Sequence, residues 1–352
     1  MKKLLLLTLA LLSSVVSHGQ YSPAVDGSPQ SILLTESRID RPLLMHKNQL
    51  QFNPGYSLSI ITGTFDNSGS RTSFEKDGLA STVHTYSLDA NYGLFDFLEL
   101  NMSLDYLSRT ESSRDLGIVG YTDFTSVSSL TEWKGLDDIG IGLGIKPWTR
   151  KTNMDLALRL GCTLPTASRY AKMPENTAIA LDANNTQIDY HNFGSLGKGV
   201  PFVNYGFNFR YRFKSAALNL SLLASNGLGK SKSNTWVAQL DNYQFTYSEI
   251  FNKVKYPNQY QGLLSADFRV FSWFDLYTGL RYSIESGGWK EIGNINYALP
   301  QTSLNQVLVG YEILTTMHLR LLQQAQIAIS GKNTDCAFEI YTSLVFSLFT
   351  SK

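Results

Sequence analysis

Histidine and serine are the residues of this sequence that could carry nucleophilic or acid–base chemistry. Four of the five histidines follow residue 19, at His46, His84, His191 and His318. His84 has Ser81 and Thr82 beside it, and a serine within reach of a histidine is the minimum for nucleophilic hydrolysis. No hydrolase motif surrounds these residues, and the alternation of the segment places His84 on the outer face of a strand. We therefore expect no enzymatic activity and interpret His84 as an interfacial side chain.

The same reasoning gives little support for a metal site. Asp189 and His191 lie close together in the sequence, but two ligands are too few for zinc. The oxygen-bearing residues Asp182, Asn184, Asn185 and Asp189 lack the spacing of a known calcium loop. The sequence therefore predicts neither a metal site nor a cofactor.

The composition narrows the class of protein. The chain has 352 residues, a formal net charge of +1, 17% charged and 12% aromatic residues. Soluble domains carry roughly 25% charged residues, and a nucleic-acid-binding protein needs a basic excess that this chain lacks. Cys162 and Cys336 are the two cysteines; two are too few for a disulfide framework, and we expect free thiols.

The first 19 residues have the layout of a secretory signal peptide. Lys2 and Lys3 precede an apolar run from Leu4 to Val16, and small residues follow up to Gly19, the expected cleavage site. The apolar run is too short for a membrane-spanning helix. Residues 20–48 then form a leader before the first strand. Its apolar residues either enter the lumen of a barrel as a plug or rest in the periplasm, and the sequence leaves both open.

From residue 49 to residue 352, apolar and polar residues alternate with the period of two that is typical of strands. In residues 98–106, Leu98, Leu100 and Met102 share one face, and Glu99 and Asn101 share the other. Strands of about 9–11 residues cross a bilayer when tilted. Twelve segments fit, at 49–61, 82–94, 98–108, 135–147, 154–165, 200–213, 216–227, 259–271, 274–285, 306–316, 319–331 and 336–348.

Long and short connections between these segments alternate, as the outer loops and periplasmic turns of outer-membrane barrels do. Lys332–Asp335 is the exception. Aromatic residues flank the short turns, where rings favour the membrane interface; they are Phe95, Phe97, Trp148, Phe213, Phe271, Trp273 and Phe274. We therefore predict an all-β fold, a closed antiparallel transmembrane β-barrel of about 12 strands over residues 49–352. The expected location is the outer membrane of a Gram-negative bacterium.

The predicted inner face carries both signs of charge. Its acids are Asp89, Glu99, Asp105, Asp138, Asp155, Asp267, Asp275, Glu312 and Glu339, and its bases are Lys146, Arg159, Arg210, Arg212, Arg269, Arg281 and Arg320. One interpretation is a structural network in which opposite charges pair across neighbouring strands. The other is a conduction path, for which Arg210, Arg212, Arg269 and Arg281 are the best candidates. Twelve strands predict a narrow lumen rather than a wide pore.

A glycine-rich strand points to a family. Gly140, Gly142 and Gly144 share one face and form a flat strip toward the lumen, and their spacing differs from that of the dinucleotide-binding motif. Together with the signal peptide and the strand layout, this run resembles outer-membrane proteins of the "meta-pathway of phenol degradation" family, which are similar to FadL-like fatty-acid channels. The usual barrel sequence ends on a phenylalanine, whereas in this sequence three residues follow Phe349. The resemblance implies uptake of small hydrophobic or aromatic compounds.

The resulting functional hypothesis is a passive, narrow channel for small hydrophobic or amphipathic solutes. Its expected partners are outer-membrane lipid and lipopolysaccharide, the solute and the barrel-assembly machinery, with no nucleic acid. The alternative is a non-conducting surface barrel whose long loops, such as 166–199 and 228–258, bind a partner. A third reading, a secreted soluble β-protein, would require the apolar rows to be sealed between two sheets.

Overall fold

The computed structural model describes Arg38 and residues 43–74, 79–114, 126–147, 153–182, 185–241, 244–292, 295–316 and 319–349. The predicted signal peptide and residues 20–37 of the leader lie outside this range. Among the described residues, no helix is long and apolar enough to span a membrane.

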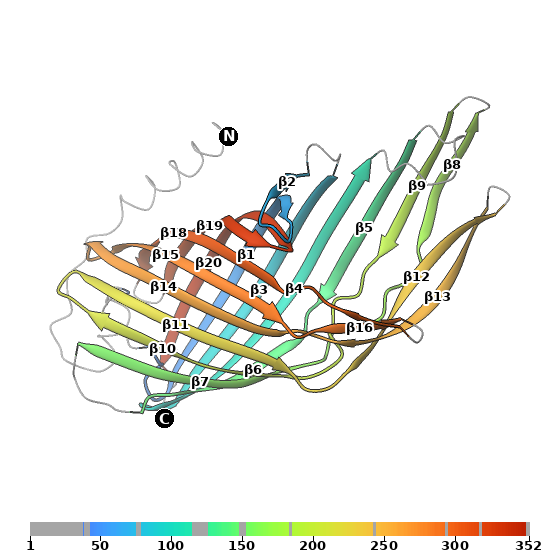
Figure 1. The fold of residues 1–352 in the computed structure, drawn as a ribbon. Helices are drawn as coiled ribbons and strands as arrows, with labels where there is room; N and C mark the ends of the chain where they lie inside the picture. The colour runs from blue at the N-terminus through green and yellow to red at the C-terminus, as the bar shows by residue number, and fades with distance from the viewer. Residues whose placement is uncertain are drawn as a thin grey trace.

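Twelve strands form a closed antiparallel barrel (Figure 1). They are β1 (Gln49–Phe65), β3 (Leu79–Phe95), β4 (Leu98–Arg114), β6 (Ile139–Ile145), β7 (Met154–Leu164), β10 (Phe202–Arg212), β11 (Ala216–Gly227), β14 (Asn258–Phe271), β15 (Phe274–Ser286), β18 (Thr302–Thr316), β19 (Leu319–Lys332) and β20 (Thr334–Phe349).

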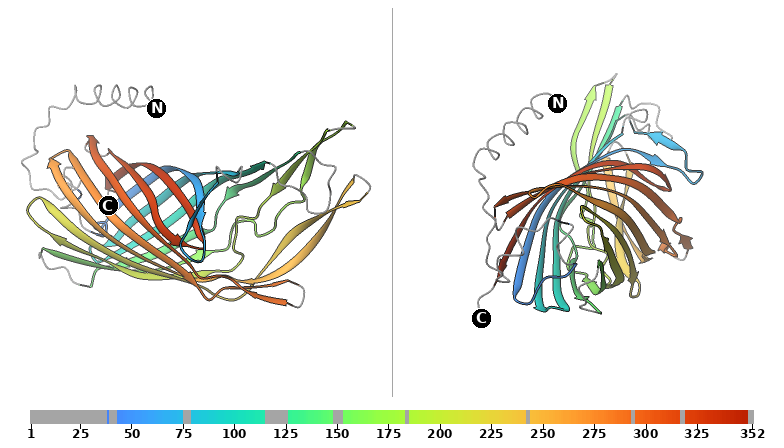
Figure 2. Two further views of the ribbon diagram at one scale, coloured as in Figure 1. Left: turned by 45° about the horizontal axis from the view of Figure 1, so that its top comes forward. Right: turned by 90° about the vertical axis from the view of Figure 1, so that its left-hand side faces the viewer.

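The ring closes between the first and last strands. β1 pairs along its whole length with β20, from Gln49 opposite Phe349 to Phe65 opposite Thr334, and its other edge pairs with β3. Each remaining barrel strand pairs with its two neighbours in the ring. The closed wall is visible along the axis (Figure 2). Closure matters because unpaired backbone N–H and C=O groups at a sheet edge find no partner in hydrocarbon.

The barrel is apolar outside and polar inside, which confirms the predicted orientation of the faces. Leu160, Leu264 and Leu280 on the outer face are more than half exposed. Asp267 and Glu99 on the inner face are 0% and 1% exposed. This is the reverse of a soluble protein, in which charges are rarely buried and large apolar side chains cover the core. The reading as a soluble sandwich is therefore wrong.

The outer connections contain strands that the sequence did not predict. The predicted segment 135–147 is in fact the end of β5 (Ser126–Leu136) and all of β6, separated by Asp137 and Asp138. Gly135 there has φ 148°, which side chains rarely tolerate. Further strands extend the wall beyond the barrel (Figure 1). They are β2 (Arg71–Ser73), β8 (Glu175–Asp182), β9 (Asn185–Phe193), β12 (Ser231–Asp241), β13 (Gln244–Lys255), β16 (Trp289–Ile292) and β17 (Ile295–Ala298).

Aromatic rings collect at the short turns, as predicted. Phe95 and Phe97 stack with ring centroids 5.5 Å apart, and Phe271 and Trp273 stack at 5.4 Å. Phe213 is also exposed at its turn, and Trp148 lies outside the described residues. Rings at this level suit the boundary between acyl chains and headgroups.

The apolar outer face of the barrel can be tested with a pair of leucine variants. Leu280 at the middle of β15 and Leu228 beyond the end of β11 are both 56% exposed. Leu280→Arg should lower the free energy of unfolding in lipid vesicles by about 2–4 kcal/mol, because it places a charge against the bilayer midplane. Leu228→Arg should leave that free energy within about 1 kcal/mol of wild type. Urea titration in vesicles measures both, and equal effects would contradict the membrane-facing assignment of β15.

Candidate functional site in the barrel lumen

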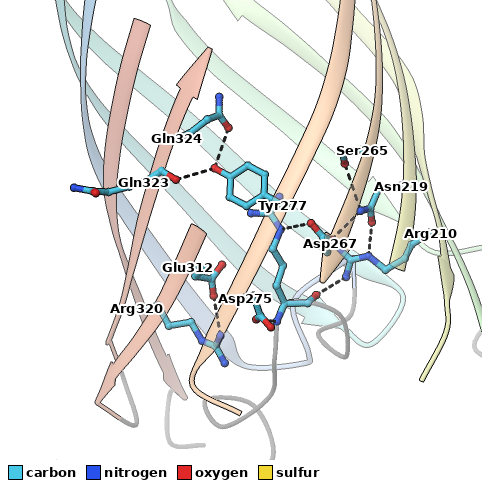
Figure 3. A network of polar contacts seen from close by, with 11 residues as sticks. Arg210, Asn219, Ser265, Asp267, Asp275, Tyr277, Glu312, Arg320, Gln323 and Gln324 are labelled. Atoms are coloured by element: carbon cyan, nitrogen blue, oxygen red, sulfur yellow. Dashed lines mark hydrogen bonds and ion pairs between the residues drawn. The ribbon is translucent and has the colours of Figure 1, made fainter. Parts of the chain in front are cut away.

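Charged and polar side chains of β10, β11, β14, β15, β18 and β19, which are consecutive in the ring, form a network in the lower part of the lumen (Figure 3). Register places Asp275 of β15 opposite Glu312 of β18. Asp267 of β14 lies opposite Ala217 of β11, and Asn219 is two residues further along β11 on the same face. Alternation brings each of these side chains inward, because every second residue of a strand faces the lumen. Opposite charges pair between neighbouring strands at Arg320 and Glu312 and at Arg212 and Asp155. Arg210 of β10 and Asp267 of β14 pair across the intervening strand β11.

Arg210 anchors one side of this network. Its Nε donates to Oδ1 of Asn219 at 2.6 Å, and its Nη2 lies 4.0 Å from Oδ2 of Asp267. Asn219 in turn donates from Nδ2 to Oδ2 of Asp267 at 2.8 Å. Asp267 is fully buried, so its charge depends on these partners.

The other side of the network contains a buried ion pair. Nη1 of Arg320 donates to Oε1 of Glu312 at 2.8 Å, and the two side chains are 5% and 3% exposed. Beside them, the hydroxyl of Tyr277 donates to Oε1 of Gln324 at 3.1 Å or to the carbonyl of Gln323 at 3.3 Å.

Arg38 of the leader contacts this network. Its Nε lies 3.0 Å from Oδ1 of Asp267, and its guanidinium sits over the Tyr277 ring, 4.2 Å from the centroid. Its main-chain N–H donates to Oδ2 of Asp275 at 2.7 Å, and its carbonyl accepts from Nη1 of Arg210 at 3.0 Å. Arg38 is thus bound through both its side chain and its backbone.

Residues 43–48 of the leader make a second set of contacts inside the barrel. The N–H of Met45 donates to Oε2 of Glu99 at 2.7 Å, and Oε1 of Glu99 accepts from Nη1 of Arg159 at 2.6 Å. Nη2 of Arg159 donates to the carbonyl of Leu43 at 3.1 Å. Glu99 and Arg159 therefore hold each other and the leader backbone at the same time.

The glycine strip has a structural consequence at this point. Leu44 is 2% exposed, and a Cβ at Gly144 would lie 2.6 Å from its Cδ2 atom. A Cβ at Gly93 would lie 1.8 Å from the carbonyl oxygen of His46. Side chains at these two positions would collide with the leader, so the glycines make room for it.

Several other predicted lumen residues are placed as follows. Oδ1 of Asp155 lies 3.1 Å from Nζ of Lys146, and Oδ2 of Asp155 contacts Nη2 of Arg212. Nη1 of Arg281 donates to Oε1 of Gln326 at 2.9 Å. Arg269 lies opposite Asp275 in register, and the carbonyl of Asp105 accepts from the N–H of Asp137. The carboxylate of Asp138 accepts from the N–H groups of Ala167 and Lys198 at 2.9 and 3.2 Å.

Above the network, the lumen opens into a cavity of about 710 Å³. Most polar groups in its wall are neutral, such as Asn101, Ser103, Thr163, Asn204 and Gln261. The charged groups in the wall are Asp137, Asp138, Arg159, Lys198 and Glu285. Arg159 pairs with Glu99, and Glu285 accepts from Gln259 at 2.7 Å. At the rim, burial raises the pKa of the Tyr256 phenol, and the nearby Asp138 carboxylate adds to the increase.

The residues considered for catalysis do not form an active site. Ser81 lies opposite Ile61 on the inner row and His84 opposite Leu58 on the outer row, so their side chains point to opposite faces. Nδ1 of His84 instead lies 2.9 Å from the Tyr56 hydroxyl. Cys162 and Cys336 are free. Among the described residues, no group of three histidines, cysteines or acids could hold a metal. Asn184 lies outside them, and so do the side chains of Asp182, Asn185 and Asp189.

Comparison with solved structures supports the fold. No protein-family model and no curated protein match this sequence. The "COG4313 outer membrane channel" from Pseudomonas putida F1 aligns over 92% of this chain and 100% of its own, with a TM-score of 0.57 and 16% identity. The chain therefore shares the β-barrel fold of that protein. The "CymD monoaromatic hydrocarbon channel" and the Ralstonia pickettii toluene transporter TbuX align over 88% and 87% of this chain at 10% and 8% identity, both with a TM-score of 0.43, too low to bear on its fold.

Sequence reasoning missed Arg38, Tyr277 and the neutral partners Asn219 and Gln324. Arg38 lies in a leader without strand periodicity, so no pattern pointed to it. Tyr277 lies between Asp275 and Gly279 in the set of alternate residues of β15 that face the lumen. Following that alternation from Asp275 would have identified it.

The buried pair supplies a double-mutant test. Arg320→Leu should lower the free energy of unfolding by about 3–5 kcal/mol, because it leaves the Glu312 carboxylate buried without its guanidinium partner. Arg320→Leu combined with Glu312→Leu should recover most of that loss. Urea unfolding in vesicles measures both. A double variant as unstable as the single one would show that the pair is not the main partner of either residue.

Proposed function

We propose that this protein is an outer-membrane channel through which small solutes pass passively, and that its leader closes the lower lumen. The observation that carries the proposal is the enclosed polar interior of a barrel whose outer face is apolar. An interior cavity of about 710 Å³ is large enough for a small organic solute. The similarity in fold to a channel protein supports this role without defining it.

The leader contacts support its role as a plug. Arg38 and Met45 are fastened to carboxylates on opposite walls, Asp275 of β15 and Glu99 of β4. The described residues of the leader are therefore bound to both walls. Passage of solute would then require these contacts to break, so the leader is the gate in this proposal.

For the solute, we propose small hydrophobic or aromatic compounds, the class implied by the family resemblance. The cavity wall contains apolar side chains such as Phe202, Leu223 and Leu304 among its neutral polar groups. Such a mixed wall suits an uncharged solute with one polar group, because it offers hydrogen bonds without requiring a buried charge.

A non-conducting surface barrel remains the second candidate, since the outer connections are long and built of strands. The loop before β8 is fastened to β12: the Ala171 N–H donates to Asn234, and Ala171 accepts from Trp236. A preorganised outer surface of this kind could bind a partner without any flux through the lumen.

Arg38→Ala tests the channel and its gate. The variant removes the ion pair with Asp267 and the contact with Tyr277, so the leader should leave the lumen more often. Liposome swelling with a small uncharged sugar should accelerate several-fold relative to wild type. Arg71→Ala, which removes an exposed arginine from β2 outside the barrel, should leave the rate unchanged.

The outcomes separate the two parts of the proposal. Equal flux through wild type and Arg38→Ala would reject the leader as the gate while keeping the channel. No flux through either protein, in vesicles shown to contain folded barrel, would reject the channel and favour the surface-binding alternative.

A further inference from the structure

A four-stranded sheet extends the barrel wall above its outer rim. It has the order β12-β13-β16-β17 and is here called the outer sheet. β13 ends two residues before β14 begins, and β15 ends two residues before β16 begins. The sheet therefore continues the wall formed by β11, β14 and β15, as both views show (Figures 1 and 2).

One face of the outer sheet packs against the molecule. Ser231, Asn252 and Val254 on this face are 1%, 2% and 7% exposed. A Cβ at Gly199 would lie 2.5 Å from Oγ of Ser231, so the loop before β10 covers this side. Neighbouring residues of a strand alternate in direction, so Lys232, Lys253 and Lys255 lie on the opposite face. Near Asn234 this opposite face is covered by Ala171 of the loop before β8, and nearer the barrel the three lysines are exposed.

The opposite face of the outer sheet gathers four lysines. Register places Lys232 of β12 directly opposite Lys253 of β13, and Lys255 is the next residue of that row. Lys230 lies over the ring of Trp289, 4.5 Å from its centroid. We name these residues, Lys230, Lys232, Lys253 and Lys255, the lysine face. Phe251, in the same row as Lys253, is 60% exposed beside them.

The lysine face carries more positive charge than its acids balance. Like charges directly opposite each other on paired strands destabilise a sheet. Glu291 approaches Lys253 at 2.9 Å, and Glu249, nearer the tip of β13, accepts from Asn234 at 2.6 Å. Four lysines against two carboxylates leave an excess positive charge, which an external anion would neutralise.

The height of the face above the membrane identifies that anion. Tyr205 and Tyr260 are outward-facing, exposed tyrosines near the outer ends of β10 and β14, at the level where rings mark a membrane interface. Lys255 lies five residues from Tyr260, a distance of at most about 17 Å along an extended chain. The height of Lys255 above Tyr260 along the membrane normal is smaller, because barrel strands are tilted. Lysine side chains at this height can reach the anionic headgroups of the outer leaflet.

We propose that the lysine face binds phosphate groups of outer-leaflet lipopolysaccharide. The exposed ring of Phe251 and the lysine stems supply apolar contact beside the charge, as side chains at an interface do. The proposal requires the barrel to lie in the outer membrane but does not require its lumen to conduct. Failure of the channel proposal therefore leaves it standing.

The test titrates the detergent-solubilised full-length chain with lipid A and measures bound lipid by native mass spectrometry. Wild type should bind bisphosphorylated lipid A at least tenfold more tightly than dephosphorylated lipid A. The combined variant Lys232→Gln, Lys253→Gln and Lys255→Gln should lose about five-fold in affinity for each lysine removed, about a hundredfold in total. Its affinity for dephosphorylated lipid A should stay unchanged.

A matched variant controls for net charge. Lys134→Gln, Lys214→Gln and Lys332→Gln remove three exposed lysines that lie on other strands and turns. This control should bind bisphosphorylated lipid A within about two-fold of wild type, because its charges lie away from the face. The lysine-face variant should also show wild-type liposome swelling, which separates this proposal from the channel.

Three results would overturn the assignment. The first is equal wild-type affinity for the two forms of lipid A, a comparison that stands even if the triple variant fails to fold. The second is an equal loss of affinity in the control variant. The third is binding of a soluble polyanion such as heparin without binding of lipid A, which would identify the face as a site for an acidic soluble partner.

Discussion

Every peptide group in the bilayer must be hydrogen-bonded within the protein, since hydrocarbon offers no partner. The pairing of β1 with β20 meets this requirement for the two strands that would otherwise be edges. Closure then separates the side chains into two sets by parity. One set meets acyl chains, and the other is enclosed with its charges, so the composition of each strand follows from the geometry of the ring.

Enclosed charges create a second requirement, because a buried ion without a partner is strongly unfavourable. In a 12-stranded ring, side chains from several strands meet across a narrow interior. Arg210, Asn219 and Asp267 satisfy one another in this way, and so do Arg320 and Glu312. The leader enters the same arrangement, since Arg38 supplies a cation to Asp267 and its backbone N–H to Asp275. Network and leader thus stabilise each other.

The upper barrel is organised differently from the lower barrel. Its wall is rich in neutral amides and hydroxyls and leaves a cavity, whereas the lower half contains buried ion pairs and contacts to Arg38 and Met45. Beyond the barrel, the separate strands β12, β13, β16 and β17 form a sheet of their own. The described part of the molecule therefore has three zones with distinct chemistry: a lower lumen with ion pairs, a chamber with a mostly neutral wall, and an outer surface with a basic face.

The sequence alone determined the number of barrel strands, their faces and the alternation of turns and loops. Period-two alternation is a local property, readable from residues such as Leu98–Met102 without any knowledge of neighbours. It also placed charged residues such as Glu99 and Asp267 on the inner face. Their partners, however, depend on register and on which strands the ring brings together, and these are non-local.

Tertiary structure alone decided the position of the leader, the break at Asp137 and the strands within the outer connections. Arg38 has no periodic context, and only the meeting of β14 and β15 brings together the carboxylates of Asp267 and Asp275 that bind it. The lysine face likewise arises from the pairing of β12 with β13, which sets Lys232 opposite Lys253 although 20 positions separate them in the chain. Local pattern fixes which way a side chain points, whereas its partner is fixed by the closure of the whole sheet.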